Sequence, residues 1–146
     1  MDKKAYKKIK EDFSWAKQDK QVLSVLLFGS VADGKEHRRS DVDIAVVVPV
    51  LSNFYYDCKK LTHKSVDSSD VLRKVFREVN TVAGNYDVHI FEELPLYIQI
   101  DIINNHEIVY TADKLSMFEY FYHYRKLWND QKHRNTMSKD ALFSLF

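Results

Sequence analysis

The hydrophobic residues of this chain gather in short continuous runs, which polar or amphipathic stretches separate. Residues 22–28 and 42–48 are rich in β-branched and long apolar side chains, and Gly29 and Pro49 follow them. Runs of this length that end at Gly or Pro are typical of buried β-strands. Residues 86–91 and 108–110 predict two further, shorter strands. The pattern therefore predicts a small sheet of about three to four strands.

Apolar residues recur at helical spacing around these strands, which predicts helices there. From residue 113 to about 136, the apolar positions cover more faces of a last, long helix than packing on one small domain needs. The fold class is therefore α/β (α+β), with a small mixed sheet, helices packed on one face and a long C-terminal helix. The earlier predicted helices span residues 2–19, 52–64, 70–83 and 95–103.

Composition narrows the class of protein. The chain has 146 residues, of which 45% are hydrophobic, and this fits a single domain over residues 1–146 with a core at about 20–112. A formal net charge of +1 argues against binding of bulk nucleic acid. Cys58 is the only cysteine, which favours a reducing, cytoplasmic setting. No apolar run reaches the length of a membrane span, so we expect no membrane association.

The candidate chemistry lies where the first two strands meet. Successive side chains of a strand point to opposite faces, so Asp41 and Asp43 share one face while Val42 and Ile44 point to the other. Two adjacent carboxylates repel each other unless a positive charge lies between them, and a divalent cation is the usual solution. Gly29, at the end of the first strand, would let the backbone approach a phosphate closely.

These residues carry a resemblance to a known family. Gly29-Ser30, ten intervening residues and Asp41-x-Asp43, with Ser40 directly before Asp41, resemble the GS-x10-DxD signature of the minimal nucleotidyltransferases. This family consists of small relatives of the catalytic domain of DNA polymerase β. The resemblance implies the polymerase β-like nucleotidyltransferase fold over roughly residues 20–112. In the family a third carboxylate lies on a later strand.

The resemblance also implies an activity and a set of site residues. We expect a transfer of AMP from ATP, dependent on two Mg²⁺ ions, to a hydroxyl group. The implied catalytic and metal-binding residues are Asp41, Asp43 and, as the third carboxylate, Asp87. The family often has a basic residue just after its Gly-Ser pair, where this chain has Val31. The nucleotide-binding residues would then be Gly29, Ser30, Ser40 and, as later sources of positive charge, Lys35 and Arg39.

The aromatic last helix suggests a partner. Its Tyr, Phe and Trp residues, Phe121 and Trp128 among them, favour an interface with a second copy or with another protein. Base stacking beside basic residues and an ordinary core helix are the alternatives. Domains resembling this one act as antitoxin-like partners of helical HEPN proteins, so we expect an HEPN-like partner that carries the acceptor hydroxyl. A non-catalytic binding module, or transfer to a small molecule or an RNA end, remains open.

Overall fold

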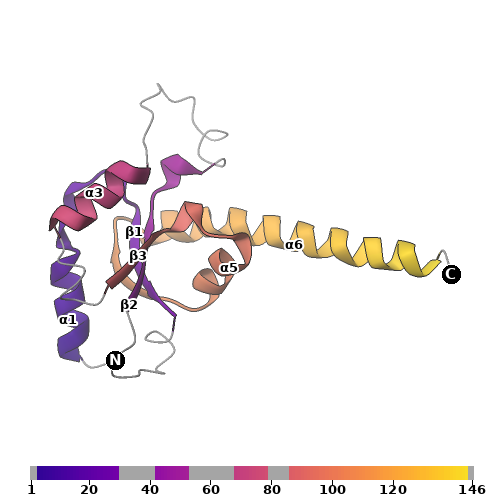
Figure 1. Cartoon of the computed structure of the whole chain (residues 1–146), viewed down its shortest axis with the longest axis horizontal. Coiled ribbons are helices and arrows are strands. Elements are labelled where there is room, and N and C mark those ends of the chain that lie inside the picture. The colour runs from indigo at the N-terminus through magenta and orange to yellow at the C-terminus, as the bar shows by residue number, and fades with distance from the viewer. Residues whose placement is uncertain (1–2, 30–41, 53–67, 79–85, 145–146) are drawn as a thin grey trace.

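A computed structural model of the chain describes residues 3–29, 42–52, 68–78 and 86–144 (Figure 1). At its centre is a four-stranded sheet in the order β3-β2-β1-β4. β1 (Ser24–Phe28) pairs antiparallel with β2 (Val42–Val47) and with β4 (Glu107–Thr111). β2 pairs parallel with β3 (Tyr86–Ile90). The predicted small mixed sheet is confirmed, and the strand that carries Asp87 lies beside the strand that carries Asp43.

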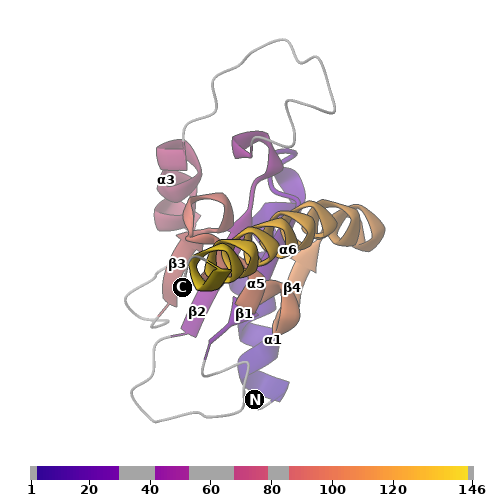
Figure 2. The ribbon, with the colours of Figure 1, turned by 90° about the vertical axis from the view of Figure 1, so that its right-hand side faces the viewer.

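The helices cover both faces of this sheet, so the prediction of helices on one face was wrong. Figures 1 and 2 show α1 (Lys3–Asp12) and α3 (Ser68–Glu78) on one side and α5 (Leu96–Asn104) and α6 (Lys114–Ser144) on the other. The physical reason is the sequence of β2, where residues 44–47 are all fully buried. Because successive strand residues point to opposite faces, such a run needs cover on both sides.

Each face of the sheet has its own hydrophobic core. Alternation along β2 sends Ile44 and Val46 into one core and Ala45 and Val47 into the other. The first core also takes residues from α1, α3 and the short 3₁₀ helix η1 (Ser14–Gln18). The second core consists mainly of residues from α5 and α6, together with Phe91 of the 3₁₀ helix η3 (Phe91–Glu93). The sheet is thus the middle layer of three.

Two predicted helices have clearly different bounds in the structure, and a third cannot be compared. The first ends at Asp12 and continues as η1, instead of running to residue 19. The helix predicted over 52–64 lies almost entirely outside the described residues, and before it η2 (Pro49–Leu51) forms a single 3₁₀ turn. The last helix runs to Ser144, beyond the predicted end near 136. Among the described residues, no helix is both long and apolar enough to cross a membrane.

The apolar residues of α6 divide between two sides of the helix. Met117, Phe121 and Tyr124 are buried in the second core, so Phe121 belongs to the core of this chain and not to a partner surface. Leu115, Phe118 and Tyr122 follow the spacing i, i+3, i+7 on the opposite side and are 68%, 45% and 63% exposed. With 31 residues, α6 is roughly 46 Å long, and it projects far beyond the sheet (Figure 1).

A buried carboxyl group joins α6 to the sheet. Glu92 accepts a hydrogen bond from the Val48 amide at 2.6 Å and another from the Tyr120 hydroxyl at 2.9 Å. The Tyr120 and Tyr124 hydroxyls lie 2.7 Å apart. Burial raises the pKa of Glu92 to about 7, although the two hydrogen bonds favour its ionised form. The Glu92 carboxyl group therefore titrates near neutral pH in the folded protein.

This titration predicts a pH dependence of stability. The pKa of Glu92 rises from 4.5 to about 7 on folding, so the folded state binds more protons than the unfolded state between these values. The stabilising contribution is complete below pH 4.5 and is lost as the pH rises through about 7. Urea unfolding at about pH 5 and pH 8 should show a smaller pH difference in Glu92→Gln than in the wild type. Glu107→Gln, which changes an exposed glutamate on β4 that does not contribute to the raised pKa of Glu92, is the control and should behave like the wild type.

Candidate active site

Asp43 and Asp87 are brought together by strand pairing. They are direct partners in the parallel register of β2 and β3, and each is the second residue of its strand. Neighbouring strands lie about 4.8 Å apart, and residues in register on paired strands point to the same face. Phe28 of β1 is the antiparallel partner of Asp43, so a row of three side chains crosses one edge of the sheet. The face is the one that α5 and α6 cover further along the strands.

His89 completes a cluster at this edge. It is two residues beyond Asp87 on the same face of β3, and its Nε2 lies 3.1 Å from Asp87 Oδ2. The Phe28 and His89 ring centroids are 6.0 Å apart. One ligand atom from each of Asp43, Asp87 and His89 can be chosen so that all three lie within 4.8 Å of one another. The side chains are partly or fully accessible, so an ion or a substrate can reach them.

Gly29 fits against the carboxylate of Asp43. Its φ of +79° lies in the left-handed region that glycine adopts without steric cost. A Cβ atom at this position would be 2.3 Å from Asp43 Oδ2, far inside van der Waals contact. The absence of a side chain at residue 29 therefore leaves room for the Asp43 carboxylate directly above the end of β1.

Gly29→Ala is expected to destabilise the protein by about 1–3 kcal/mol, because it combines a strained φ with this overlap. A double-mutant cycle separates the two causes. In an Asp43→Ala background Oδ2 is absent, so only the cost of the backbone conformation remains. Urea unfolding of the four proteins should show a smaller loss on Gly29→Ala in that background. Equal losses in both backgrounds would mean that the Asp43 carboxylate does not pack on residue 29.

The predicted site residues fall into two groups. Gly29, Asp43 and Asp87 lie together at one edge of the sheet, as described above. His89 was not among the predicted site residues, although the sequence places it two residues after Asp87 on the same face of a strand. The other predicted site residues lie outside the described part of the chain, and they are Ser30, Lys35, Arg39, Ser40 and Asp41.

The chemistry of the edge fits a divalent cation. Asp43 and Asp87 offer carboxylate oxygens, and His89 offers an imidazole nitrogen. These are donor types that bind divalent metal ions in proteins. The side chains come from adjacent strands of a packed sheet, so their backbone positions are fixed before any ion arrives.

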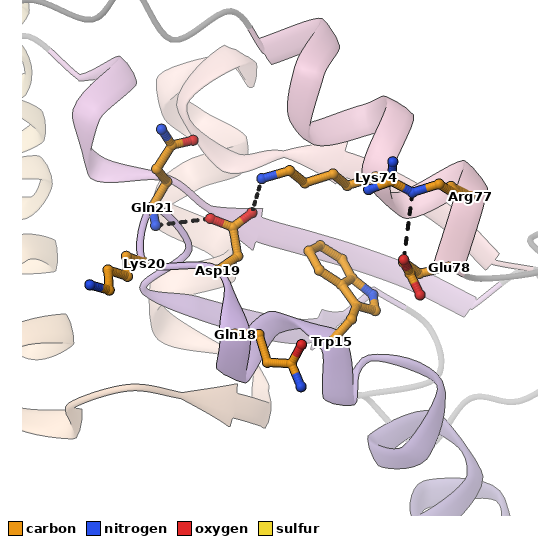
Figure 3. Close-up of a pocket in the computed structure, with 8 residues that line it drawn as sticks. All are labelled: Trp15, Gln18, Asp19, Lys20, Gln21, Lys74, Arg77 and Glu78. Atoms are coloured by element: carbon orange, nitrogen blue, oxygen red, sulfur yellow. Dashed lines mark hydrogen bonds and ion pairs between the residues drawn. The ribbon is translucent and has the colours of Figure 1, made fainter.

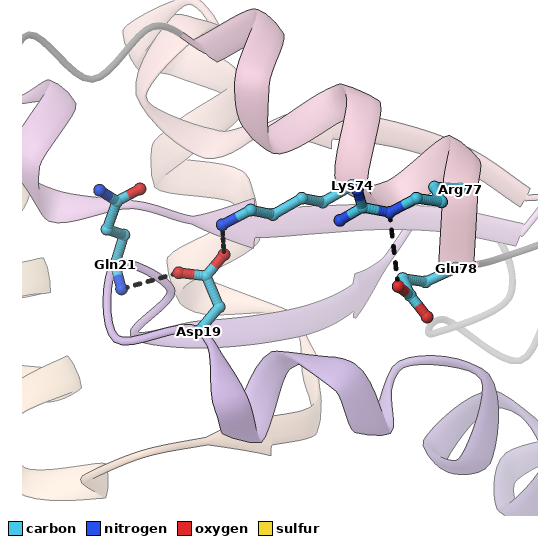
Figure 4. A network of polar contacts seen from close by, with 5 residues as sticks. All are labelled: Asp19, Gln21, Lys74, Arg77 and Glu78. Carbon is cyan, nitrogen blue, oxygen red and sulfur yellow. Dashed lines mark hydrogen bonds and ion pairs between the residues drawn. The ribbon is translucent and has the colours of Figure 1, made fainter.

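A second polar region lies on the opposite face of the sheet (Figure 3). It is a pocket of about 380 Å³ between η1 and α3. Figure 4 shows that Asp19 accepts a hydrogen bond from the Gln21 amide at 3.0 Å and pairs with Lys74 at 2.9 Å. The Trp15 indole N–H has no hydrogen-bond partner among the described residues. This pocket has no paired carboxylates, so we place the candidate active site at the Asp43–Asp87 edge.

Comparisons of sequence found similarity to known proteins. Residues 7–115 match the family described as "Polymerase beta, Nucleotidyltransferase". The chain is 37% identical over 115 residues to the "Putative protein adenylyltransferase MJ1547" of Methanocaldococcus jannaschii. The aligned residues cover 78% of this chain and 75% of that protein.

Solved structures share the fold. A toxin–antitoxin structure with AMP-PNP matches with a TM-score of 0.58 at 15% identity, over 91% of this chain and 98% of that chain. A structure of the tri-AMPylated Shewanella oneidensis HEPN toxin in complex with MNT antitoxin matches with a TM-score of 0.55 at 12% identity. That match covers 97% of this chain and 99% of the other. At these identities the likeness establishes the fold alone.

Proposed function

We propose that this chain, which belongs to the polymerase β nucleotidyltransferase family, transfers AMP from ATP to a hydroxyl group on a partner protein. That it is a nucleotidyltransferase follows from the family match and from the adenylyltransferase relative. The observation that carries the proposal is the in-register pair Asp43 and Asp87, which places two carboxylates at one edge of the sheet in a chain of this family.

The reaction makes and breaks one bond at phosphorus. The acceptor oxygen bonds to the α-phosphorus, and the bond from this phosphorus to the pyrophosphate oxygen breaks. A divalent cation, for which the family resemblance implies Mg²⁺, would supply positive charge beside the triphosphate and the attacking oxygen. Asp43 and Asp87 are the described residues that would hold it, and Asp41 completes the proposed set.

The described residues also have a geometry that suits nucleotide binding. Gly29 directly follows β1 and has no side chain, so a triphosphate can approach the backbone there closely. The carboxylates come from the start of paired strands, and this fixes their spacing without help from a ligand. We propose that Ser30, Ser40, Lys35 and Arg39 contact the phosphates from the segment between β1 and β2.

The protein acceptor is favoured over other acceptors by three observations. The Methanocaldococcus relative is named a protein adenylyltransferase, and one neighbour of the same fold was solved with an AMPylated HEPN toxin. The net charge of +1 provides little attraction for a long polyanionic acceptor. We therefore propose an HEPN-like protein as the partner and a tyrosine hydroxyl on it as the acceptor.

Label transfer tests this proposal directly. The purified chain is incubated with α-labelled ATP, a divalent cation and the product of its neighbouring gene, and mass spectrometry then locates the label. AMP on a side chain of the partner protein is the expected result. Label found only on RNA or on a small molecule would overturn the protein acceptor. A stable complex that carries no label would favour the second candidate function, a non-catalytic binding module.

The projecting helix α6 favours a docking role in either case. Leu115, Phe118 and Tyr122 form an apolar stripe on the side of α6 that faces away from the core, and we propose that the helical partner packs there. The stripe lies on the same helix that packs over the face carrying Asp43, which would bring a bound protein near the carboxylates.

Tyr122→Ala is expected to weaken partner binding by at least about tenfold, because exposed Tyr residues at the centre of interfaces often contribute about 2 kcal/mol. Tyr97→Ala is the matched control, since Tyr97 on α5 is also a tyrosine and is equally exposed, at 63%. Calorimetry or surface plasmon resonance with the purified partner measures both. An equal loss in the two variants would place the contact elsewhere than on the α6 stripe.

A further inference from the structure

A metal site made of the two carboxylates does not require a histidine at position 89. A metal centre built from carboxylates alone would place only oxygen ligands around the ion, as hard cations such as Mg²⁺ prefer. At this edge, however, an imidazole lies on the same strand face as Asp87. Its Nε2 is 3.1 Å from Asp87 Oδ2, and the ring stands beside Phe28.

The separations fit shared coordination. Two ligand atoms at about 2.1 Å from one ion lie between about 3 and 4.2 Å apart in octahedral geometry. The 3.1 Å between His89 Nε2 and Asp87 Oδ2 falls within this range. The three ligand atoms of Asp43, Asp87 and His89 lie within 4.8 Å of one another. Side-chain rotations that move these atoms by several tenths of an ångström would therefore allow all three to bind one ion.

The donor types determine which ion the site binds more tightly. Imidazole nitrogen is a better ligand for first-row transition metals than for Mg²⁺, which retains water and oxygen ligands. Mn²⁺ accepts both carboxylate oxygen and imidazole nitrogen and has a size and charge that allow it to replace Mg²⁺. A nitrogen ligand therefore raises the affinity for Mn²⁺ more than the affinity for Mg²⁺.

We propose that His89 is a further ligand of the divalent cation, in addition to the carboxylates, and that it makes the centre prefer Mn²⁺ to Mg²⁺. The proposal rests on the proposed function only in taking this edge of the sheet as the metal site. His89 is then a specificity-determining residue, because the carboxylates alone provide the charge and the imidazole selects the ion.

Binding of Mn²⁺ alone tests the proposal, without ATP and without a partner protein. The full chain, prepared without a polyhistidine tag, is titrated with Mn²⁺, and electron paramagnetic resonance measures the free ion. Pulsed measurements on the bound ion should show coupling to a ¹⁴N nucleus. His89→Gln should remove this coupling and raise the Kd for Mn²⁺ by about 10–100-fold. The Kd for Mg²⁺, measured by competition, should change by about threefold or less.

Two further variants test whether the nitrogen coupling comes from His89. His89→Asp converts the cluster to three carboxylates, so it should bind Mg²⁺ at least as well as the wild type while showing no nitrogen coupling. His106→Gln is the control histidine, since His106 Nδ1 bonds to the Ile102 carbonyl at 2.8 Å and His106 is not part of the Asp43–Asp87–His89 cluster. It should retain both the coupling and the Mn²⁺ affinity. Circular dichroism and thermal melting confirm that each variant is folded.

The outcomes separate this proposal from the proposed function. Absence of nitrogen coupling in the wild type, or its persistence in both folded His89 variants, would overturn the ligand assignment. Nitrogen coupling that depends on His89, in a chain that labels no protein, would leave the inference intact and contradict the protein acceptor. Label transfer to the partner by a chain that binds Mn²⁺ without nitrogen coupling would support the function and remove His89 from the metal centre.

Discussion

Asp43→Asn is expected to lower the rate of AMP transfer on the order of a thousandfold or more, while the protein stays folded. Asparagine keeps the size of the side chain but removes the charge that would hold the cation next to Asp87. Charge stabilisation by a metal ion contributes several kcal/mol to such a transition state. Each loss of about 1.4 kcal/mol lowers the rate tenfold. Single-turnover label transfer at saturating ATP measures the effect.

The stability of the same variant provides an independent check. Removing one of two neighbouring carboxylates relieves repulsion, so the free energy of unfolding without metal should rise or stay level. Asp101→Asn, on the exposed side of α5, is the matched control and should leave the rate unchanged. Mn²⁺ or Mg²⁺ that binds Asp43→Asn as tightly as the wild type would remove Asp43 from the metal site.

Phe91→Ala is expected to cause the largest loss of stability, about 3–5 kcal/mol. Phe91 directly follows β3 and is fully buried. Its ring centroid lies 5.3 Å from that of Phe121 and 5.1 Å from that of Tyr124, so it connects the strand of Asp87 to α6. Because a domain of this size is stable by only about 5–15 kcal/mol, urea unfolding should show a much lower midpoint.

Phe118→Ala is the matched control for this substitution. It removes the same side chain from α6 at a position that is 45% exposed, so the loss should be below about 1 kcal/mol. Similar losses in the two variants would show that Phe91 does not anchor α6 to the sheet. Loss of α6 packing in Phe91→Ala should also expose Trp128, which packs against the second core, and shift its fluorescence.

The strands and the positions of Asp43 and Asp87 on them could be predicted because their signals are local. Residues 22–28 and 42–48 are apolar at nearly every position, and β-strands form there with bounds within two residues of the prediction. The positions of Gly29 and Asp43 follow directly from the ends of these strands. Asp87 could be assigned by family resemblance, and the parallel pairing of β2 with β3 places it beside Asp43.

Other features depended on contacts between distant segments. The apolar run at residues 44–47 indicates cover on both faces of the sheet, but only the placement of α1, α3, α5 and α6 shows which helices cover each face. The aromatic residues of α6 looked like one surface in the sequence, but the position of the sheet assigns Phe121 to the core and Tyr122 to the exterior. Periodicity shows which residues lie on the same side of a helix, whereas only packing decides which side faces the core.

The sequence by itself therefore determined the strand segments, the end of β1 at Gly29 and the presence of carboxylates at strand starts, because each follows from neighbouring residues. Tertiary structure alone decided the register that sets Asp43 opposite Asp87 and the approach of the Asp43 carboxylate to Gly29. The physical reason is that register and side-chain contact depend on how strands from separate segments of the chain align when both faces of the sheet are packed.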